Sequence, residues 1–229
     1  MKTDVTEAII IAGGKGTRLM PLTVDKPKAL VEIDNKPILQ RQIEWLNSNG
    51  INHVIVCVGH MSNKIEKWVK KQKHLGVTLS KEDSPLGTGG AIKRAMMALR
   101  EYRKPFVVLN CDDITNIDLQ SMKKTFDDNK NYKLAILAVA NPTLPYGDIT
   151  INSDGLIESF NEKPKLVDKW VSCGVYIFHP DIKDELPDIG MVETFTFPRI
   201  TAIVYKHGGK WLPITSAHDV AEFSKRWNV

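Results

Sequence analysis

The amino-acid sequence predicts a single α/β domain in which helices cover both faces of a largely parallel sheet. Apolar runs of strand length alternate with helical patterns from the N-terminus, and this is the order of βαβ units. The run at residues 106–109 is almost continuously apolar, as in strands that are buried on both faces. With 229 residues, of which 42% are hydrophobic and 25% charged, the chain is long enough for one large core.

The first half of the sequence predicts strands that are separated by helices. In the first of these helices Leu39, Ile43 and Leu46 recur at spacings of four and three, and Gly50 supplies a left-handed stop. The strands are expected at residues 8–12, 53–58, 77–82, 106–110 and 134–140, and the helices at residues 37–49, 64–75, 90–101 and 118–129.

The second half has a different pattern, with short alternating strands and frequent prolines. Residues 148–152 and 156–160 flank the turn Ser153-Asp154-Gly155, which predicts a hairpin that is added to the sheet. No repeat or linker interrupts the chain, so we expect one domain, 1–229, with halves at about 1–140 and about 141–229. The remaining elements are expected as a strand at 174–178, a helix at 197–206, a strand at 210–214 and a helix at 218–227.

The net charge of +4 is mild, and the basic residues are scattered or mixed with acids. The densest basic run is Lys70, Lys71 and Lys73. A solvated helix face explains this run better than a nucleic-acid surface, because no aromatic stacking residues are interleaved with it. We therefore expect no nucleic-acid partner, whereas small anionic substrates are compatible with this charge.

The cysteines and the N-terminal residues indicate in which cellular compartment the protein is expected. Cys57, Cys111 and Cys173 are odd in number, far apart and set in apolar runs, which predicts buried free thiols in a reducing environment. Residues 1–7 are polar, and the apolar run at 8–12 is too short for a signal peptide or a membrane span. We therefore expect a cytoplasmic protein without a membrane partner.

A glycine-rich segment, AGGKGTRL from Ala12 to Leu19, directly follows the first predicted strand. Glycines let backbone N–H groups approach an anion closely, so such a loop is typical of a phosphate site. A dinucleotide fingerprint would need a third glycine at Leu19, and a P-loop would need GK[ST] after four intervening residues. Neither of these better-known loops fits the segment.

Two cationic side chains lie in this loop and in the segment that follows it. An arginine fork at Arg18 and a flexible ammonium at Lys28, at the carboxyl end of one strand, can together neutralise a triphosphate. The pattern GxGTRLxPLT at residues 14–23, followed by Pro27-Lys28, resembles the signature of the sugar-phosphate nucleotidyltransferases, also called NDP-sugar pyrophosphorylases.

Later landmarks of this family follow in the expected order along nearly the whole chain. They are a second nucleotide loop at 85–91 (PLGTGGA), a strand ending in Asn110-Cys111-Asp112, and the sugar-binding segments Tyr146-Gly147, 160–164 (FNEKP) and 174–176 (GVY). Residues 86–92 are most similar to heptose- and mannose-1-phosphate guanylyltransferases. The resemblance thus favours GTP with a mannose- or heptose-type sugar phosphate, and uridylyl- and thymidylyltransferases, which differ there by few residues, are the alternatives.

The resemblance implies a Rossmann-like three-layer α/β/α fold with a mixed central sheet and a β-rich half that binds the sugar phosphate. It implies that Arg18, Lys28 and Lys163 are catalytic and that Asp112 binds Mg²⁺. Nucleotide binding is implied for Ala12, Gly13, Gly14, Gly16, Thr17, Glu82, Gly87 and Thr88, and sugar binding for Gly147, Glu162 and Ser172.

The implied reaction joins an NTP and a sugar 1-phosphate into an NDP-sugar and pyrophosphate. A sugar 1-phosphate is largely a dianion at neutral pH, because its second pKa is about 6, so its oxygen needs no general base. The sequence also offers no histidine cluster for a metal, because His60, His179 and His218 do not have metal-ligand spacing. We expect direct in-line displacement without a covalent intermediate.

One departure from the family concerns the metal site. The family often has a Trp-x-Asp-Ile-Gly-Thr segment near its end, whereas residues 211–216 read WLPITS, with Pro213 at the aspartate position. Asp113 or Asp219 could complete the site, or Asp112, water and phosphate oxygens could hold magnesium. The missing carboxylate also motivates a second hypothesis, a non-catalytic sensor of nucleotides or sugar nucleotides on the same fold.

Simpler structural roles compete with three of these assignments. Asp112 would otherwise cap a turn, Lys163 would otherwise be a solvated loop charge, and Gly89-Gly90 would only open a helix. A nicotinamide dehydrogenase is a third hypothesis for the function. No pattern in the sequence predicts the oligomeric state.

Overall fold

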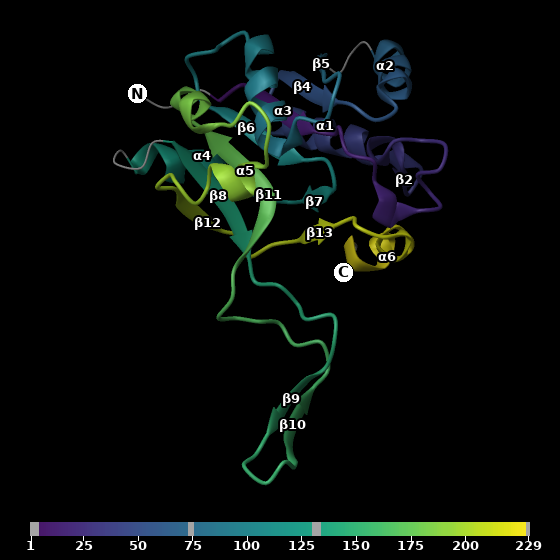
Figure 1. Cartoon of the computed structure of the whole chain (residues 1–229), viewed down its shortest axis with the longest axis vertical. Coiled ribbons are helices and arrows are strands. Elements are labelled where there is room, and N and C mark those ends of the chain that lie inside the picture. The colour runs from purple at the N-terminus through teal and green to yellow at the C-terminus, as the bar shows by residue number, and fades with distance from the viewer. Residues whose placement is uncertain (1–4, 73–75, 130–133, 228–229) are drawn as a thin grey trace.

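The computed structural model describes residues 5–72, 76–129 and 134–227. Its centre is a seven-stranded sheet (Figure 1). The strands of this sheet are β1 (Glu7–Ile11), β4 (His53–Val58), β5 (Val77–Lys81), β6 (Phe106–Asn110), β8 (Ala135–Ala140), β11 (Val171–Phe178) and β12 (Ile203–Lys206). They lie across the sheet in the order β12-β8-β11-β6-β1-β4-β5.

The sheet is mixed, as predicted. β1 pairs in parallel with both β4 and β6, β4 pairs in parallel with β5, and β12 pairs in parallel with β8. β11 runs antiparallel to both of its neighbours, β6 and β8. The chain proceeds from β1 outward to β4 and β5 and then returns to β6 on the other side of β1. The strand order therefore reverses at β1, which is where open α/β sheets bind ligands.

Helices cover both faces of the sheet, which confirms the three-layer α/β/α prediction (Figure 1). Successive residues of β1 enter different cores: Ile10 belongs to one buried cluster with Leu39, and Ile9 to the other with Ile92. The first cluster includes residues of α1 (Ile38–Ser48), α2 (Ser62–Lys71), α4 (Leu119–Asp128) and α6 (Ala217–Trp227), and the second includes residues of α3 (Gly87–Ala95), η4 (Met96–Ala98), η5 (Pro180–Glu185) and α5 (Val192–Phe195).

Most of the predicted elements are confirmed. The strands expected in the first half correspond to β1, β4, β5, β6 and β8, and the helices at 37–49, 118–129 and 218–227 correspond to α1, α4 and α6. The helix expected at 64–75 begins at Ser62, and its last residues, 73–75, with Lys73 among them, lie outside the described residues. Lys70 is exposed on α2 and pairs with Glu66, as a solvated helix face predicts.

The helix expected at residues 197–206 is wrong, because this segment contains β12. Ile203 and Tyr205 are half-buried while Val204 and Lys206 are exposed, which is a period of two and not of 3.6. Strand β12 pairs in parallel with β8 at the sheet edge, so tertiary pairing overrides the weak helical pattern.

The hairpin is also placed differently from the prediction. Strands β9 (Asp148–Ile151) and β10 (Ile157–Asn161) form a separate two-stranded sheet and are not added to the central one. Figure 1 shows them at the end of a long ribbon that leaves the body beyond β8 and β11. We call residues 141–170 the projecting arm. Its side chains find no core, because both faces of the hairpin are exposed.

Short elements complete the fold around the sheet. They are the turns of 3₁₀ helix η1 (Thr17–Leu19) and η2 (Lys28–Leu30), the strand pair β2 (Glu32–Ile33) and β3 (Lys36–Pro37), and the pair β7 (Asp113–Thr115) and β13 (Trp211–Pro213). The predicted strand at 210–214 is β13, whereas β7 was not expected.

The cysteines are unpaired and buried, as the sequence predicts. Burial raises the pKa of each thiol to about 12, so the thiols stay protonated at neutral pH. Among the described residues, no helix has the length and apolar character needed to cross a bilayer.

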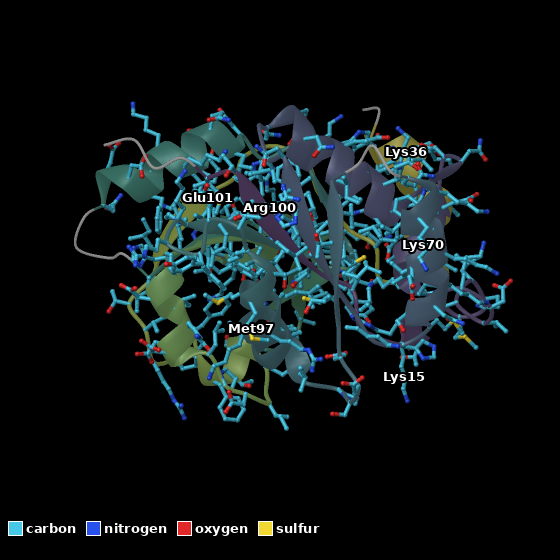
Figure 2. All side chains as sticks on the ribbon, turned by 90° about the horizontal axis from the view of Figure 1, so that it is seen from above. Lys15, Lys36, Lys70, Met97, Arg100 and Glu101 are labelled. Atoms are coloured by element: carbon cyan, nitrogen blue, oxygen red, sulfur yellow. The ribbon has the colours of Figure 1, made fainter. Side chains whose placement is uncertain are left out.

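A buried polar cluster connects β1 with β4 and with the loop before β6. Oε1 of Glu7 lies 2.5 Å from Nδ1 of His53, and the carboxylate also accepts hydrogen bonds from the backbone amides of Arg100 and Glu101, both labelled in Figure 2. Burial raises the pKa of Glu7, but the hydrogen bonds from His53 and the two amides outweigh burial and hold the pKa below its ordinary value of 4.5.

We expect Glu7→Gln to lower the free energy of unfolding at neutral pH by about 1–3 kcal/mol, because buried donors lose their charged acceptor. A carboxyl whose pKa is depressed by folding stabilises the protein above its unfolded pKa and loses that contribution as the pH falls through its folded pKa. The difference between wild type and variant should therefore narrow below pH 4.5.

Urea titrations at a series of pH values measure this difference. Glu66→Gln on the exposed surface of α2 is the matched control and should change stability little. A loss at Glu7 that stays constant from neutral to acid pH would contradict the assignment.

Candidate functional site

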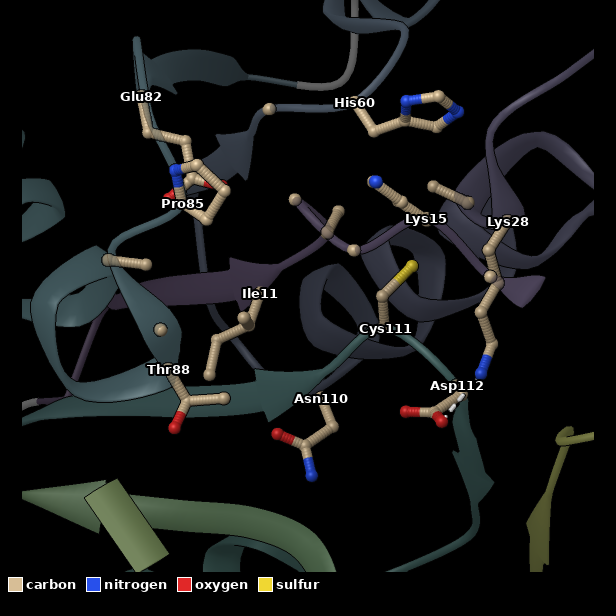
Figure 3. Close-up of a pocket in the computed structure, with 18 of the residues that line it drawn as sticks. Ile11, Lys15, Lys28, His60, Glu82, Pro85, Thr88, Asn110, Cys111 and Asp112 are labelled. Carbon is tan, nitrogen blue, oxygen red and sulfur yellow. Dashed lines mark hydrogen bonds and ion pairs between the residues drawn. The ribbon is translucent and has the colours of Figure 1, made fainter. Parts of the chain in front are cut away.

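A cavity of about 780 Å³ opens at the carboxyl edge of the parallel strands, which is within the usual size of small-molecule sites. Its walls come from the ends of four neighbouring strands: Gly13 follows β1, Gly59 follows β4, Glu82 follows β5, and Asn110 ends β6. Figure 3 shows the side chains of Glu82, Asn110 and other lining residues around it. The cavity therefore lies where the strand order reverses.

The first glycine loop turns sharply after β1. Gly16 adopts a left-handed φ of +64°, and a Cβ there would lie 3.0 Å from the Cβ of Lys28. The hydroxyl of Thr23 donates a 2.9 Å hydrogen bond to the Gly16 carbonyl, which fixes the turn. The turn places Lys15 and Arg18 in the cavity lining, beside backbone amides of the loop. Two cations and backbone N–H groups at one edge suit a phosphate chain.

Lys28 and Asp112 form an ion pair in the cavity wall. Nζ of Lys28 lies 2.6 Å from Oδ2 of Asp112, and Figure 3 shows this contact as a dashed line. Their side chains are 17% and 26% exposed, so solvent only partly screens the attraction. Lys28 opens η2, and Asp112 follows β6, so the fold of the sheet and of the first loop is needed to bring them together.

Asp113 lies behind Asp112 and is 6% exposed. Its Oδ1 accepts a 2.8 Å hydrogen bond from Nε1 of Trp211, and β7 pairs it with Pro213. Burial, followed by repulsion from the Asp112 carboxylate, raises the pKa of Asp113 to about 7. Asp113 does not line the cavity. It anchors the β13 segment from inside the protein.

Asp219, the other carboxylate that the sequence suggested for a metal, also has structural partners. Its Oδ2 accepts hydrogen bonds from the backbone amides and hydroxyls of Thr215 and Ser216, at 2.9–3.0 Å. It caps the start of α6 and is absent from the cavity lining, whereas Thr215 lies in that lining.

These contacts decide which kind of magnesium site the residues fit. The described residues contain no group of three or more His, Cys, Asp and Glu side chains that could hold a metal. Asp112 alone among the three candidate carboxylates lines the cavity, and its Oδ1 accepts no hydrogen bond from the described part of the chain. Magnesium commonly takes one or two carboxylates together with waters and substrate phosphates. The residues therefore fit a magnesium ion that is shared with a bound nucleotide.

The second glycine loop packs against a distant segment. The amides of Gly89 and Gly90 donate to the carbonyl of Gly190, and the amide of Gly190 donates to the carbonyl of Leu86. The third and fourth amides of α3 (Gly87–Ala95) are thus used by the protein itself. The sequence left open whether Gly89-Gly90 only opens a helix, and the structure adds close backbone packing as a second role.

Thr88 joins this loop to α5. Its hydroxyl accepts a 2.8 Å hydrogen bond from the amide of Val192 and lies 2.7 Å from Oε2 of Glu193. Thr88, Met191 and Glu193 all line the cavity. One end of the cavity is therefore closed by residues that are about a hundred positions apart in the sequence.

The predicted site residues fall into two groups. The residues predicted for the nucleotide and its metal meet in the cavity lining: Ala12, Gly13, Gly14, Gly16, Thr17, Arg18, Lys28, Glu82, Gly87, Thr88 and Asp112. The residues predicted for the sugar phosphate do not line it: Gly147, Glu162 and Lys163 lie on the projecting arm, and Ser172 lies on β11, where its hydroxyl contacts that of Tyr176. The roles of both groups remain predictions.

Several lining residues were not predicted. Lys15 sits between the glycines of the first loop, and this position was a usable signal. His60 follows β4, and Glu193 lies on α5, outside any motif of the sequence. These two reach the cavity only through the order of strands and the packing of α5 on α3.

Comparisons with known proteins place this cavity in context. The family model described as nucleotidyl transferase matches residues 7–194. The chain is 40% identical over 186 residues to the mannose-1-phosphate guanylyltransferase catalytic subunit beta of Xenopus tropicalis, and the match covers 79% of this chain and 51% of that protein. The Drosophila melanogaster protein of the same name is 37% identical over 202 residues, which cover 86% of this chain and 54% of the relative. The chain thus spans about half the length of these relatives.

Solved structures give the same fold. HddC from Yersinia pseudotuberculosis, crystallised in complex with GMP-PN, is 26% identical, with a TM-score of 0.73 and coverage of 97% of this chain and 100% of that one. A UDP-glucose pyrophosphorylase complexed with UDP-glucose has a TM-score of 0.70 at 22% identity, with coverage of 98% and 99%, and this likeness concerns the fold alone.

Gly174, in the irregular part of β11, closely approaches Asp113 and Asn110, and Asn110 lines the cavity. The φ of Gly174 is +67°, and a Cβ there would collide with Oδ2 of Asp113 and lie 2.8 Å from Nδ2 of Asn110. We expect Gly174→Ala to lower the free energy of unfolding by about 1–3 kcal/mol through overpacking, in addition to the cost of the left-handed backbone.

Gly50→Ala is the matched control, because Gly50 has a φ of +82° and a Cβ added there would meet no heavy atom within 4 Å. Gly50→Ala should therefore lower the free energy of unfolding only by the cost of an alanine in a left-handed backbone conformation. Urea unfolding of both variants gives the difference, and equal losses would show that Asp113 does not pack against Gly174.

Proposed function

The chain belongs to the nucleotidyl transferase family, and on that basis we propose that it joins a sugar 1-phosphate to a nucleoside triphosphate and releases pyrophosphate. The observation that carries the proposal is the cavity at the carboxyl edge of β1 and β6, where Arg18, Lys28 and Asp112 meet a glycine loop. Cationic side chains and loop amides recognise a triphosphate, and a carboxylate beside them accommodates its counter-cation.

The chemistry needs positioning more than proton transfer. An oxygen of the sugar phosphate forms a bond to the α-phosphorus of the NTP, and the bond from that phosphorus to the α,β-bridging oxygen breaks. Pyrophosphate leaves with the electron pair. In this proposal Arg18 and Lys15, which line the cavity in the first loop, neutralise the charge that builds on the leaving group. No general base is required, because the attacking phosphate is already ionised at neutral pH.

Asp112 would hold magnesium together with the phosphates of the nucleotide. When bound, the ion supplies charge neutralisation and polarises the phosphoryl oxygens. The ion pair of Lys28 and Asp112 keeps two opposite charges matched in the wall. Lys28 can turn from Asp112 toward a phosphate oxygen when the nucleotide binds. Asp112 would then bind magnesium in place of the Lys28 ammonium.

The relatives support a guanine base and a mannose-type sugar phosphate. The curated relatives are named mannose-1-phosphate guanylyltransferases, and HddC was crystallised with GMP-PN. The likeness of residues 86–92 to guanylyltransferases points the same way. We therefore assign GTP with mannose or heptose 1-phosphate as the first substrates to test. UTP and dTTP with glucose 1-phosphate are the comparison substrates.

The proposal predicts that the purified protein releases pyrophosphate only when an NTP and a sugar 1-phosphate are both present. Arg18→Ala should lower kcat by about 10² to 10³-fold, which is about 3–4 kcal/mol and the scale for one electrostatic donor. Arg103→Ala, on the surface beside Tyr102, is the matched control and should retain the wild-type rate. Nucleotide binding without pyrophosphate release from any substrate pair would favour the non-catalytic sensor.

A second prediction concerns the metal. Asp112→Asn should remove the magnesium-dependent activity, because the amide keeps the shape of the side chain but gives no negative charge to a hard cation. A magnesium titration of the turnover rate measures the effect, with Asp184→Asn, at an exposed position of η5, as the control. An unchanged magnesium dependence in Asp112→Asn would remove this residue from the metal site.

A further inference from the structure

Gln42 is a polar residue on the buried face of α1. It is only 3% exposed, and it lies outside the glycine loops and the other segments that the sequence singled out. The burial of an amide is unfavourable unless its polar atoms are hydrogen-bonded. The other buried side chains of this helix are apolar, namely Ile38, Leu39, Ile43 and Leu46.

The Gln42 amide donates to two backbone carbonyls that are distant from it in the sequence. Its Nε2 lies 2.8 Å from the carbonyl oxygen of Asn110 and 2.9 Å from that of Asp113. An NH2 group has two hydrogens, so each hydrogen can bind one of the two carbonyls. Because a carbonyl oxygen only accepts, these contacts also fix which end of the amide is the nitrogen. Gln42 thus uses both of its donors on one short segment.

This segment is the turn that carries Asp112. Asn110 ends β6 and Asp113 begins β7, so the two carbonyls flank Cys111 and Asp112 on either side (Figure 3). The Asp112 side chain lines the cavity, whereas Gln42 does not. The amide therefore holds the turn from the core, and the carboxylate of the same turn faces the cavity.

Backbone hydrogen bonds attach this turn to two other segments. The amide of Cys111 donates to the carbonyl of Ile11 at the end of β1, and the amide of Ile214 donates to the carbonyl of Asp112 at 2.7 Å. Gln42 adds an attachment to α1. This attachment belongs to a side chain, so a single substitution can remove it without changing the backbone of the turn.

The oxygen of the Gln42 amide shows that this residue is not the choice that stability alone would favour. Oε1 is buried and has no hydrogen-bond partner in the described part of the chain. A buried polar atom without a partner destabilises the folded state, and an apolar side chain of the same shape avoids this cost. Methionine has a similar length and fits irregular cores well. The fixed geometry of the turn is the benefit that only the amide provides.

We propose that Gln42 is a positioning residue, which orients the Asp112 carboxylate toward the magnesium ion of the bound nucleotide. This inference rests on the proposed function for the role of Asp112. Groups that hold a metal ligand from behind orient it, and their loss typically lowers metal affinity or activity about 10 to 100-fold. Without the amide, two carbonyls lose their donor, and the turn can shift relative to the glycine loop. The carboxylate then no longer has one fixed position in the cavity wall.

Satisfying two carbonyls at strand ends is the competing, purely structural role, and nucleotide binding separates the two roles without any turnover. Isothermal titration calorimetry measures the affinity for GTP in magnesium and again in EDTA. Gln42→Met should raise the Kd for GTP in magnesium by about 10 to 100-fold and leave the Kd in EDTA unchanged. A structural defect in the cavity would weaken both.

Gln40→Met is the matched control, because it makes the same chemical change on the same helix. Gln40 donates to the carboxylate of Glu44 on the outer side of α1 and does not contact the turn. Its GTP affinity in magnesium should equal that of the wild type. Urea unfolding confirms that each variant is folded before its affinity is compared.

Gln42→Glu is a second variant for the case in which Gln42→Met does not fold. It keeps the shape of the side chain but removes the NH2 group and leaves at most one donor. Methionine removes polar atoms from the core and glutamate adds an ionisable group, so the two changes shift the burial cost in opposite directions. If both variants lose the effect of magnesium on GTP affinity, the loss comes from the missing donors. Wild-type GTP affinity in magnesium in a folded variant of either kind would overturn the proposal.

Turnover provides the second readout. In Gln42→Met the magnesium concentration that gives half of the maximal rate should rise about 10 to 100-fold. The KM for mannose 1-phosphate should stay at its wild-type value, and high magnesium should restore most of the rate. A kcat that stays low at every magnesium concentration would show general damage to the site and contradict a positioning role.

The outcomes also separate this inference from the proposed function. If no substrate pair releases pyrophosphate but Gln42→Met still loses the effect of magnesium on GTP affinity, the positioning role stands and the proposed reaction is rejected. If the wild type is active and Gln42→Met matches it at every magnesium concentration, the reaction stands and the positioning role is rejected. A wild type whose GTP affinity does not depend on magnesium would reject the metal role of Asp112 and this inference with it.

Discussion

The parallel pairing of β1 with both β4 and β6 is the constraint on which the site depends. Parallel strands end at one edge, so the segments after β1, β4, β5 and β6 converge there. The near-continuous burial of β4 and β6 places this pairing in the centre of the core. The glycine loop and Asp112, about a hundred residues apart, are brought together by this core, which also positions Lys28 beside the carboxylate.

Two adjacent aspartates show how the environment divides their roles. Asp112 remains partly exposed and pairs with Lys28, whereas Asp113 is buried and bonds to Trp211. The buried carboxyl has a raised pKa because it loses water and faces a like charge. Asp112 and Asp113 follow β6 as neighbours in the chain, but Asp112 faces the cavity whereas Asp113 holds β13 in place.

The antiparallel strand β11 has a different consequence. It inserts between β6 and β8 and links the second half of the chain to the sheet through backbone pairing on both sides. Because β8 and β11 continue outward as one ribbon, the segment between them leaves the body of the protein. The residues predicted for the nucleotide and for the sugar phosphate thus belong to one chain but to two surfaces of it (Figure 1).

Local patterns in the sequence suffice for the α/β class, for strands β1, β4, β5, β6 and β8 and for the glycine-rich phosphate loop, because apolar periodicity and glycine spacing are local properties. They also predict Arg18 and Lys28 at one phosphate site, the family resemblance adds Asp112, and all three lie in the cavity lining. They fail for β12, whose strand form comes from pairing with β8, and for the hairpin, whose separation from the sheet no local pattern encodes. His60 and Glu193 reach the cavity only through packing across the fold. Tertiary structure decided these features because pairing partners and close backbone approaches are chosen by contacts between segments that are distant in the chain.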